Sequence, residues 1–142
     1  MDYFAYGSNM SLEHMRRLCG WHAHLIGRAV LSDFDLALDS RGYGNLIQKQ
    51  GSSVWGLLFD IDQQALDALD DFEGYPEGFD RWQVEATDDH KEKHTAWVYI
   101  EPKEIDTGAK PRAEYWQRVI AAAKAGNLPQ EWIEKLEKLI AQ

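Results

Sequence analysis

The sequence predicts an α+β domain with a curved or barrel-like sheet. Residues 23–60 carry apolar side chains at a period near two, and residues 82–87 and 95–100 do the same. Helical patterns occur irregularly around these stretches, without the strict alternation of strand and helix that marks a doubly wound fold. A length of 142 residues fits one hydrophobic core. We therefore expect residues 1–142 to form a single domain.

The composition indicates a folded protein and disfavours two classes of partner. Hydrophobic residues make up 44% of the chain and aromatic residues 12%, which is too apolar for a disordered segment. The formal net charge of -9 repels phosphate backbones and anionic lipid surfaces. We therefore expect neither a nucleic-acid nor a membrane partner.

Three further features predict a cytoplasmic location. No apolar run approaches the ~18 residues that a bilayer-spanning helix needs. The start, Met1-Asp2-Tyr3, lacks the basic residues of a secretory signal. The single Cys19 excludes an internal disulfide framework and fits a reducing compartment, where it packs as a small core residue.

The chain opens with a strand, a tight loop and a helix. Residues 2–6 are rich in aromatic side chains and predict a strand, and Gly7-Ser8-Asn9 is a turn signal. Ser11 can cap a helix that Gly20 ends.

In the middle of the chain, glycines and a helix-capping residue mark where the predicted strands and helix begin and end. Gly42, Gly44 and Gly51 are expected to break residues 23–60 into separate strands. Residues 62–73 predict a helix with Asp62 as its cap and Gly74 after its end. The two later strand patterns, joined by the polar residues 88–94, predict a hairpin.

Two helices are predicted near the end of the chain. One spans residues 111–125 and stops at Gly126, and the other starts at Pro129.

Glu73 is the residue most at odds with its predicted surroundings. On a helical projection it falls between Leu66 and Leu69, on an apolar stripe that also contains Ala65 and Phe72. An unpaired buried carboxylate is costly and its pKa rises, so its presence there points to a function. The alternative is that the helix frays before Gly74 and leaves Glu73 in solvent.

The loop after the first strand is a second candidate site. Successive backbone N–H groups around Gly7 can point together at an anion or an oxyanion, and glycine permits close approach. The alternative is an ordinary turn that only connects two elements.

Four segments in order resemble the γ-glutamylcyclotransferase-like family. They are YFAYGSNM at residues 3–10, SVWGLLF at residues 53–59, LDDFEGY at residues 69–75, and Tyr115 followed twelve residues later by NLP at residues 127–129. The similarity spans nearly the whole chain.

The resemblance implies a small mixed β-barrel wrapped by helices, and it implies site residues. Glu73 carries over as the catalytic acid and base. The substrate-binding residues implied by the same resemblance are Tyr6, Gly7, Ser8, Asn9, Met10, Ser11, Tyr99 and Tyr115. In the family a tyrosine often lies two residues before an arginine in the segment after the glutamate, and here Phe79 precedes Arg81.

The activity implied by the resemblance is cyclisation of a γ-glutamyl group to 5-oxoproline, with release of an amino acid or amine. No cofactor is implied. Related subfamilies, including the glutathione-metabolism branch, differ in substrate, so a γ-glutamyl peptide, an amine and a larger γ-glutamyl conjugate all remain open. A module that binds a γ-glutamyl group or a similar small acid without turnover is the alternative, although such a binder gains little from an inward carboxylate.

Other motifs do not predict a site. His22 and His24, and likewise His90 and His94, lack an evident third ligand, so we expect no metal. The second pair lies in a polar hairpin turn beside Lys91 and Lys93, and we expect its histidines to be solvated. No dinucleotide or Walker-type loop is present, nor the Gly-x-Ser-x-Gly pattern of a serine hydrolase. The acidic cluster of residues 67, 70 and 71 is expected to be a solvated helix face.

The sequence leaves the oligomeric state open. Trp21 and Trp132 are candidates for exposed aromatic residues at the interface of a homodimer.

Overall fold

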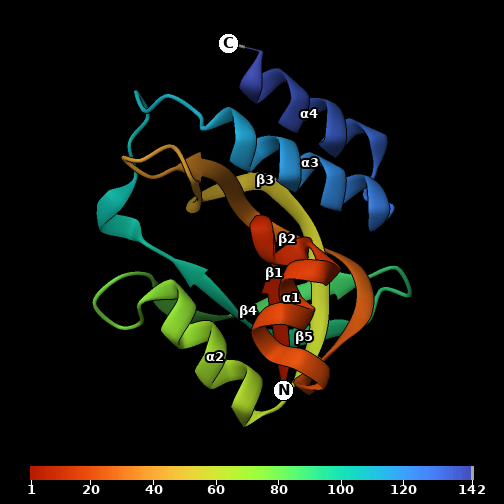
Figure 1. Ribbon diagram of the computed structural model, residues 1–142. Helices are drawn as coiled ribbons and strands as arrows, with labels where there is room; N and C mark the ends of the chain where they lie inside the picture. The colour runs from red at the N-terminus through yellow and green to blue at the C-terminus, as the bar shows by residue number, and fades with distance from the viewer. Residues whose placement is uncertain (142) are drawn as a thin grey trace.

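A computed structural model describes residues 1–141, and its centre is a closed five-stranded barrel (Figure 1). The strands are β1 (Asp2–Ala5), β2 (Ala23–Leu38), β3 (Gly44–Ile61), β4 (Asp80–Asp88) and β5 (Lys93–Ile100). Their order around the barrel is β1-β3-β2-β4-β5. Neighbours are antiparallel, except that β1 runs parallel to β5 where the barrel closes. The predicted α+β fold with a barrel-like sheet is confirmed.

The two long strands contain a bulge where a strand break was expected. Asp33 and Gly51 both have positive φ, and the register of β2 on β3 shifts between Ser32 and Phe34. The backbone N–H of Gly51 donates to Asp33 Oδ1 at 3.0 Å. Gly51 therefore lies inside β3 and does not separate two strands, because a bulge accommodates its backbone within the ladder.

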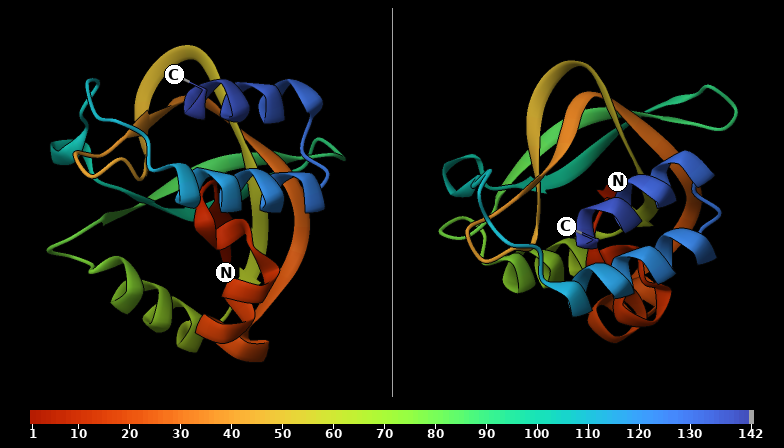
Figure 2. Two further views of the ribbon diagram at one scale, coloured as in Figure 1. Left: turned by 45° about the horizontal axis from the view of Figure 1, so that its top comes forward. Right: turned by 90° about the horizontal axis from the view of Figure 1, so that it is seen from above.

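The helices are α1 (Leu12–Cys19), α2 (Gln63–Glu73), α3 (Ala113–Ala125) and α4 (Gln130–Ile140). Figure 2 shows α3 and α4 packed side by side against the barrel, while α1 and α2 lie together elsewhere on it. The predicted start of α3 at residue 111 is two residues early, since the extended Arg112 is its N-cap. Within residues 1–141, no helix combines the length and apolar character needed to cross a membrane.

The tryptophans predicted for an interface differ in environment. Trp132 is buried in the core, whereas Trp21 is 75% exposed. The prediction that Trp132 is exposed is therefore wrong, because Trp132 lies on the buried side of α4. Trp116 is also fully buried, and its Nε1 donates to the carbonyl of Gly42 at 3.0 Å, which ties α3 to the turn before β3.

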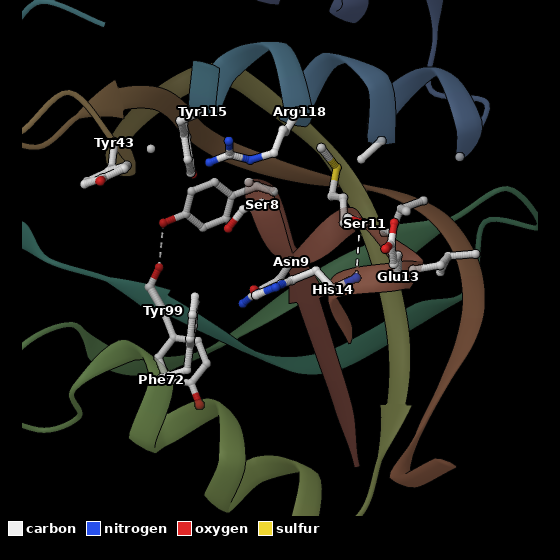
Figure 3. A pocket seen from close by; sticks show the side chains of 18 of the residues that line it. Ser8, Asn9, Ser11, Glu13, His14, Tyr43, Phe72, Tyr99, Tyr115 and Arg118 are labelled. Carbon is white, nitrogen blue, oxygen red and sulfur yellow. Dashed lines mark hydrogen bonds between the residues drawn. The ribbon is translucent and has the colours of Figure 1, made fainter. Parts of the chain in front are cut away.

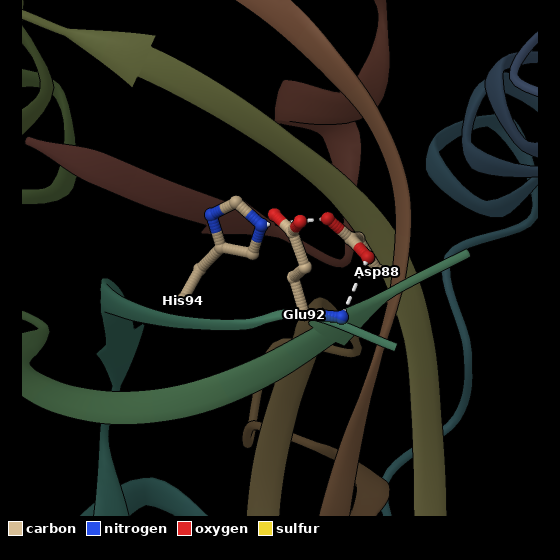
Figure 4. A group of neighbouring side chains, drawn as sticks. All are labelled: Asp88, Glu92 and His94. Carbon is tan, nitrogen blue, oxygen red and sulfur yellow. Dashed lines mark hydrogen bonds and ion pairs between the residues drawn. The ribbon is translucent and has the colours of Figure 1, made fainter. Parts of the chain in front are cut away.

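His94 is not the solvated histidine that its hairpin position predicted. Its Nδ1 lies 2.9 Å from Asp2 and its Nε2 lies 2.8 Å from Asp88, and these carboxylates raise its pKa. Figure 4 shows Asp88, Glu92 and His94 together in the β4–β5 hairpin. One carboxylate or imidazole atom from each lies within 4.8 Å of those of the other two. Because both ring nitrogens already have carboxylate partners, we assign His94 a structural role in joining β1 to the hairpin.

Candidate active site

The loop after β1 turns sharply and packs against α3. Gly7 leads into a 3-10 turn, η1 (Ser8–Met10), and the N–H of Met10 donates back to the Gly7 carbonyl at 3.0 Å. Ser11 then caps α1 by accepting from the His14 N–H. The first N–H groups of a helical turn have no partner within that turn. The backbone of this segment can therefore donate hydrogen bonds to an anion.

Glu73 is the last residue of α2, and the helix does not fray there. Gly74 adopts the left-handed conformation, and its N–H donates to the carbonyls of Asp70 and Asp71. The N–H of Phe79 donates to the Glu73 carbonyl at 3.1 Å, which ties the following loop to the helix end. A left-handed glycine at this position is a common helix C-cap. The last turn is thus intact, and Glu73 is half-buried.

The carboxylate of Glu73 meets the side chain of Asn9 from the N-terminal loop. Asn9 Nδ2 donates to Glu73 Oε1 at 3.2 Å and to the Tyr3 hydroxyl at 2.7 Å. Burial raises the pKa of Glu73 to about 7, although the Asn9 hydrogen bond and the charge of Arg41 act in the opposite direction. Glu73 therefore exchanges a proton near neutral pH, as a group that acts as both acid and base must.

A cavity of about 850 Å³ brings every predicted site residue together (Figure 3). Glu73 comes from α2, Tyr99 from β5 and Tyr115 from α3, and all three line it with the loop of residues 6–11. The elements involved are separated by long stretches of sequence, so only the closed barrel with its packed helices gathers them. What each residue does for a substrate stays a prediction.

The tyrosine hydroxyls have different surroundings. Tyr6 donates to the Tyr99 carbonyl at 2.7 Å, and Tyr99 donates to Asp70 Oδ1 at 2.6 Å, so both already have protein partners. The Tyr115 hydroxyl has backbone partners at Gly44 and Ser8. It lies against the loop, since a methyl group on Gly7 would lie 2.5 Å from its oxygen. Burial raises the pKa of Tyr115 to about 12, which keeps its proton in place at neutral pH.

Asp70 does not lie on a solvated face, contrary to the expectation for the acidic cluster. Besides Tyr99, it pairs with Arg81 at 3.4 Å. The guanidinium of Arg81 lies over the rings of Tyr75 and Trp97, at 4.5 and 4.4 Å from their centroids. Asp67 and Asp71 are exposed, as predicted. The difference arises because Asp70 faces β4 and β5, which the helical pattern alone does not reveal.

Phe72 also departs from its predicted place on the buried stripe. Its side chain is 50% exposed, and its ring packs edge-on against His14, with the centroids 4.9 Å apart. It lines the cavity at the side where α1 faces α2.

Several cavity residues were missed by the sequence reasoning. Tyr3 contacts Asn9, while Arg41 and Tyr43 belong to the turn before β3, whose conformation the sequence does not specify. Arg118 lies three residues after Tyr115, and this helical spacing is a signal that could have identified it. Figure 3 shows it on α3 with Tyr115, and both residues line the cavity.

Comparison with known proteins agrees with this arrangement. A model of the family described as "Gamma-glutamyl cyclotransferase, AIG2-like" matches residues 3–118. The chain belongs to this family. The predicted resemblance is thereby confirmed, and the match includes the loop, Glu73, Tyr99 and Tyr115.

Proteins named gamma-glutamylcyclotransferase are similar to this chain in sequence and structure. The human protein named gamma-glutamylcyclotransferase is 28% identical over 96% of this chain and 77% of its own length, and the mouse protein of the same name gives the same values. A solved structure named gamma-glutamyl cyclotransferase superposes with a TM-score of 0.88 at 27% identity, covering 96% of this chain and 86% of that one. These relatives support an enzyme of this family.

Proposed function

We propose that this chain cyclises the γ-glutamyl group of a small γ-glutamyl peptide or amine to 5-oxoproline and releases the amino acid or amine. The observation that carries the proposal is a half-buried Glu73, with a pKa of about 7, in the same cavity as the backbone loop at Gly7. Family membership supports the same reaction class.

In the proposed reaction, the α-ammonium of the substrate gives a proton to Glu73. The α-nitrogen then bonds to the γ-carbonyl carbon of the same residue. Glu73 delivers a proton to the departing nitrogen as its bond to that carbon breaks. The remaining α-nitrogen proton lost on lactam formation also ends on the released amine, so the products are the 5-oxoproline carboxylate and an ammonium, with no water consumed. One carboxylate near neutral pKa suffices for these transfers.

The loop and Asn9 would supply hydrogen-bond partners for the polar groups of the substrate. Backbone N–H groups of the loop at residues 7–9 would hold either the α-carboxylate or the developing oxyanion, and one such donor contributes about 3 kcal/mol to barrier lowering. Asn9 Oδ1 is buried and has no hydrogen-bond partner among residues 1–141, so it can accept from the α-amine. Holding the tethered amine close to the carbonyl favours ring closure.

The test is mass-spectrometric detection of 5-oxoproline after incubation with a panel of γ-glutamyl dipeptides and γ-glutamyl amines. Wild type should form product, and Glu73→Gln should lower the rate by about 10²- to 10⁴-fold while circular dichroism shows an unchanged fold. Wild-type turnover by Glu73→Gln would refute the role of this residue. Binding without product from any panel member would favour the non-catalytic module.

A further inference from the structure

The cavity has more room than a γ-glutamyl group requires. Its volume of about 850 Å³ falls among those of pockets that hold drug-sized ligands. It extends from Glu73 past the loop to Ala121 and Ala125 on α3. The part beside α3 is therefore available to the departing amine and its substituents.

Three arginines line this cavity, and they differ in their partners. Arg17 pairs with Glu13 at 2.9 Å, and Arg41 pairs with Asp39 at 2.9 Å. Arg118 has neither an ion pair nor a hydrogen bond within the part of the chain that the structure describes, and its side chain is exposed. An arginine that lines a cavity and has no carboxylate partner in the protein can bind a carboxylate of a ligand.

The position of Arg118 follows from the helix that carries it. Residues three apart on a helix share a face, so Arg118 and Tyr115 both turn toward the loop. Figure 3 shows Arg118 and Tyr115 both extending from α3, and both line the cavity together with Ser8 and Asn9. Arg118 also adds to the electrostatic effect of Arg17 on His14, where burial is the main cause of a lowered pKa. The cavity is thus acidic at Glu73 and cationic beside α3.

We propose that Arg118 binds a carboxylate carried by the departing amine, and so makes the site selective for γ-glutamyl amino acids and peptides over uncharged γ-glutamyl amines. This rests on the proposed function. The planar guanidinium matches a carboxylate with two parallel hydrogen bonds. It also supplies local attraction for an anionic substrate in a protein of net charge -9. Arg118 is a specificity-determining residue and takes no part in proton transfer.

The experiment compares γ-glutamylalanine with γ-glutamylethylamine, which lacks only the carboxylate of the departing group, and with the neutral γ-glutamylalaninamide. Arg118→Ala should lower kcat/KM for γ-glutamylalanine by about 10- to 100-fold and change it within about twofold for the two neutral substrates. Arg118→Lys keeps the positive charge but loses the two parallel N–H donors of the guanidinium. Its kcat/KM for γ-glutamylalanine should lie between those of wild type and Arg118→Ala. Lys124→Ala is the matched control, because it removes a cation from α3 outside the cavity lining.

Two outcomes would overturn the assignment. An equal loss on all three substrates would mean that Arg118 holds the α-carboxylate, which they share. No change on γ-glutamylalanine would mean that Arg118 binds no part of the substrate. Failure of the wild type to form 5-oxoproline from any substrate would refute the proposed function instead, and calorimetric binding of the same three compounds to wild type and Arg118→Ala would then decide the carboxylate site by itself.

Discussion

Asn9 Nδ2 lies 3.2 Å from Glu73 Oε1, and this contact joins residues that are 64 positions apart in the chain. The same Nδ2 donates to the Tyr3 hydroxyl, so Asn9 links β1 to the end of α2. The position and the proton affinity of the carboxylate therefore depend on the N-terminal loop as well as on the helix that carries it.

Replacement of Asn9 by Ala should move the acid limb of the pH profile. The Asn9 hydrogen bond lowers the pKa of Glu73 against the effect of burial, so its loss raises that pKa further. We expect the acid limb of kcat/KM to shift upward by about one pH unit, measured from pH 5 to 9.

Tyr3→Phe is the matched control for this shift, because it removes the other partner of Asn9 and leaves Glu73 untouched. Equal shifts in both variants would show that the direct contact between Asn9 and Glu73 is not the cause.

Glu73 should make the protein less stable as the pH rises. Its pKa of about 7 in the folded protein lies above the ordinary value of 4.5, so its contribution to stability is present below pH 4.5 and is lost as the pH rises through 7. The shift corresponds to at most about 3 kcal/mol. Glu73→Gln should therefore gain stability relative to wild type between pH 5 and pH 8.5, measured by urea unfolding.

Glu77→Gln serves as the control for that measurement, since Glu77 is exposed in the loop after α2. If the two variants differ from wild type by the same pH-independent amount, burial of the Glu73 charge is not responsible.

Asp70→Ala should destabilise the fold far more than Asp71→Ala on the same helix. Loss of Asp70 leaves the Tyr99 hydroxyl and Arg81, whose side chain is only 15% exposed, without their partner. Breaking a buried pair by removal of one member costs about 3–5 kcal/mol, whereas an exposed substitution stays within about 0.5 kcal/mol. Urea midpoints at constant m-value measure the difference, and similar midpoints would contradict the inferred role of Asp70.

Gly7→Ala should be rescued by Tyr115→Phe. The new methyl group would meet the Tyr115 hydroxyl oxygen at 2.5 Å but the ring carbon bearing it at 3.7 Å, which is ordinary contact. We expect Gly7→Ala to cost about 1–3 kcal/mol and the second substitution to recover most of that loss. A double-mutant cycle on thermal unfolding tests this, and additive effects would place the strain elsewhere in the loop.

Local elements of this protein could be predicted because their determinants lie close together in the sequence. Asp62 accepts from the Ala65 N–H and Gly74 takes the left-handed conformation, so both ends of α2 depend on residues within a few positions. The same holds for the cap at Ser11. The strand break predicted at Gly51 was wrong because glycine is common both in bulges and between strands. The pairing with the partner strand decides which of the two forms.

The sequence by itself determined the helices, most of the strand pattern, the loop at Gly7 and the placement of Glu73 on an apolar stripe, because each follows from local hydrogen bonding and periodicity. Only the tertiary structure decided what contacts Glu73, which strands cover Asp70 on α2 and which cavity Arg118 lines. Those relationships join elements far apart in the chain, and closure of the barrel by β1 against β5 sets the distances between them.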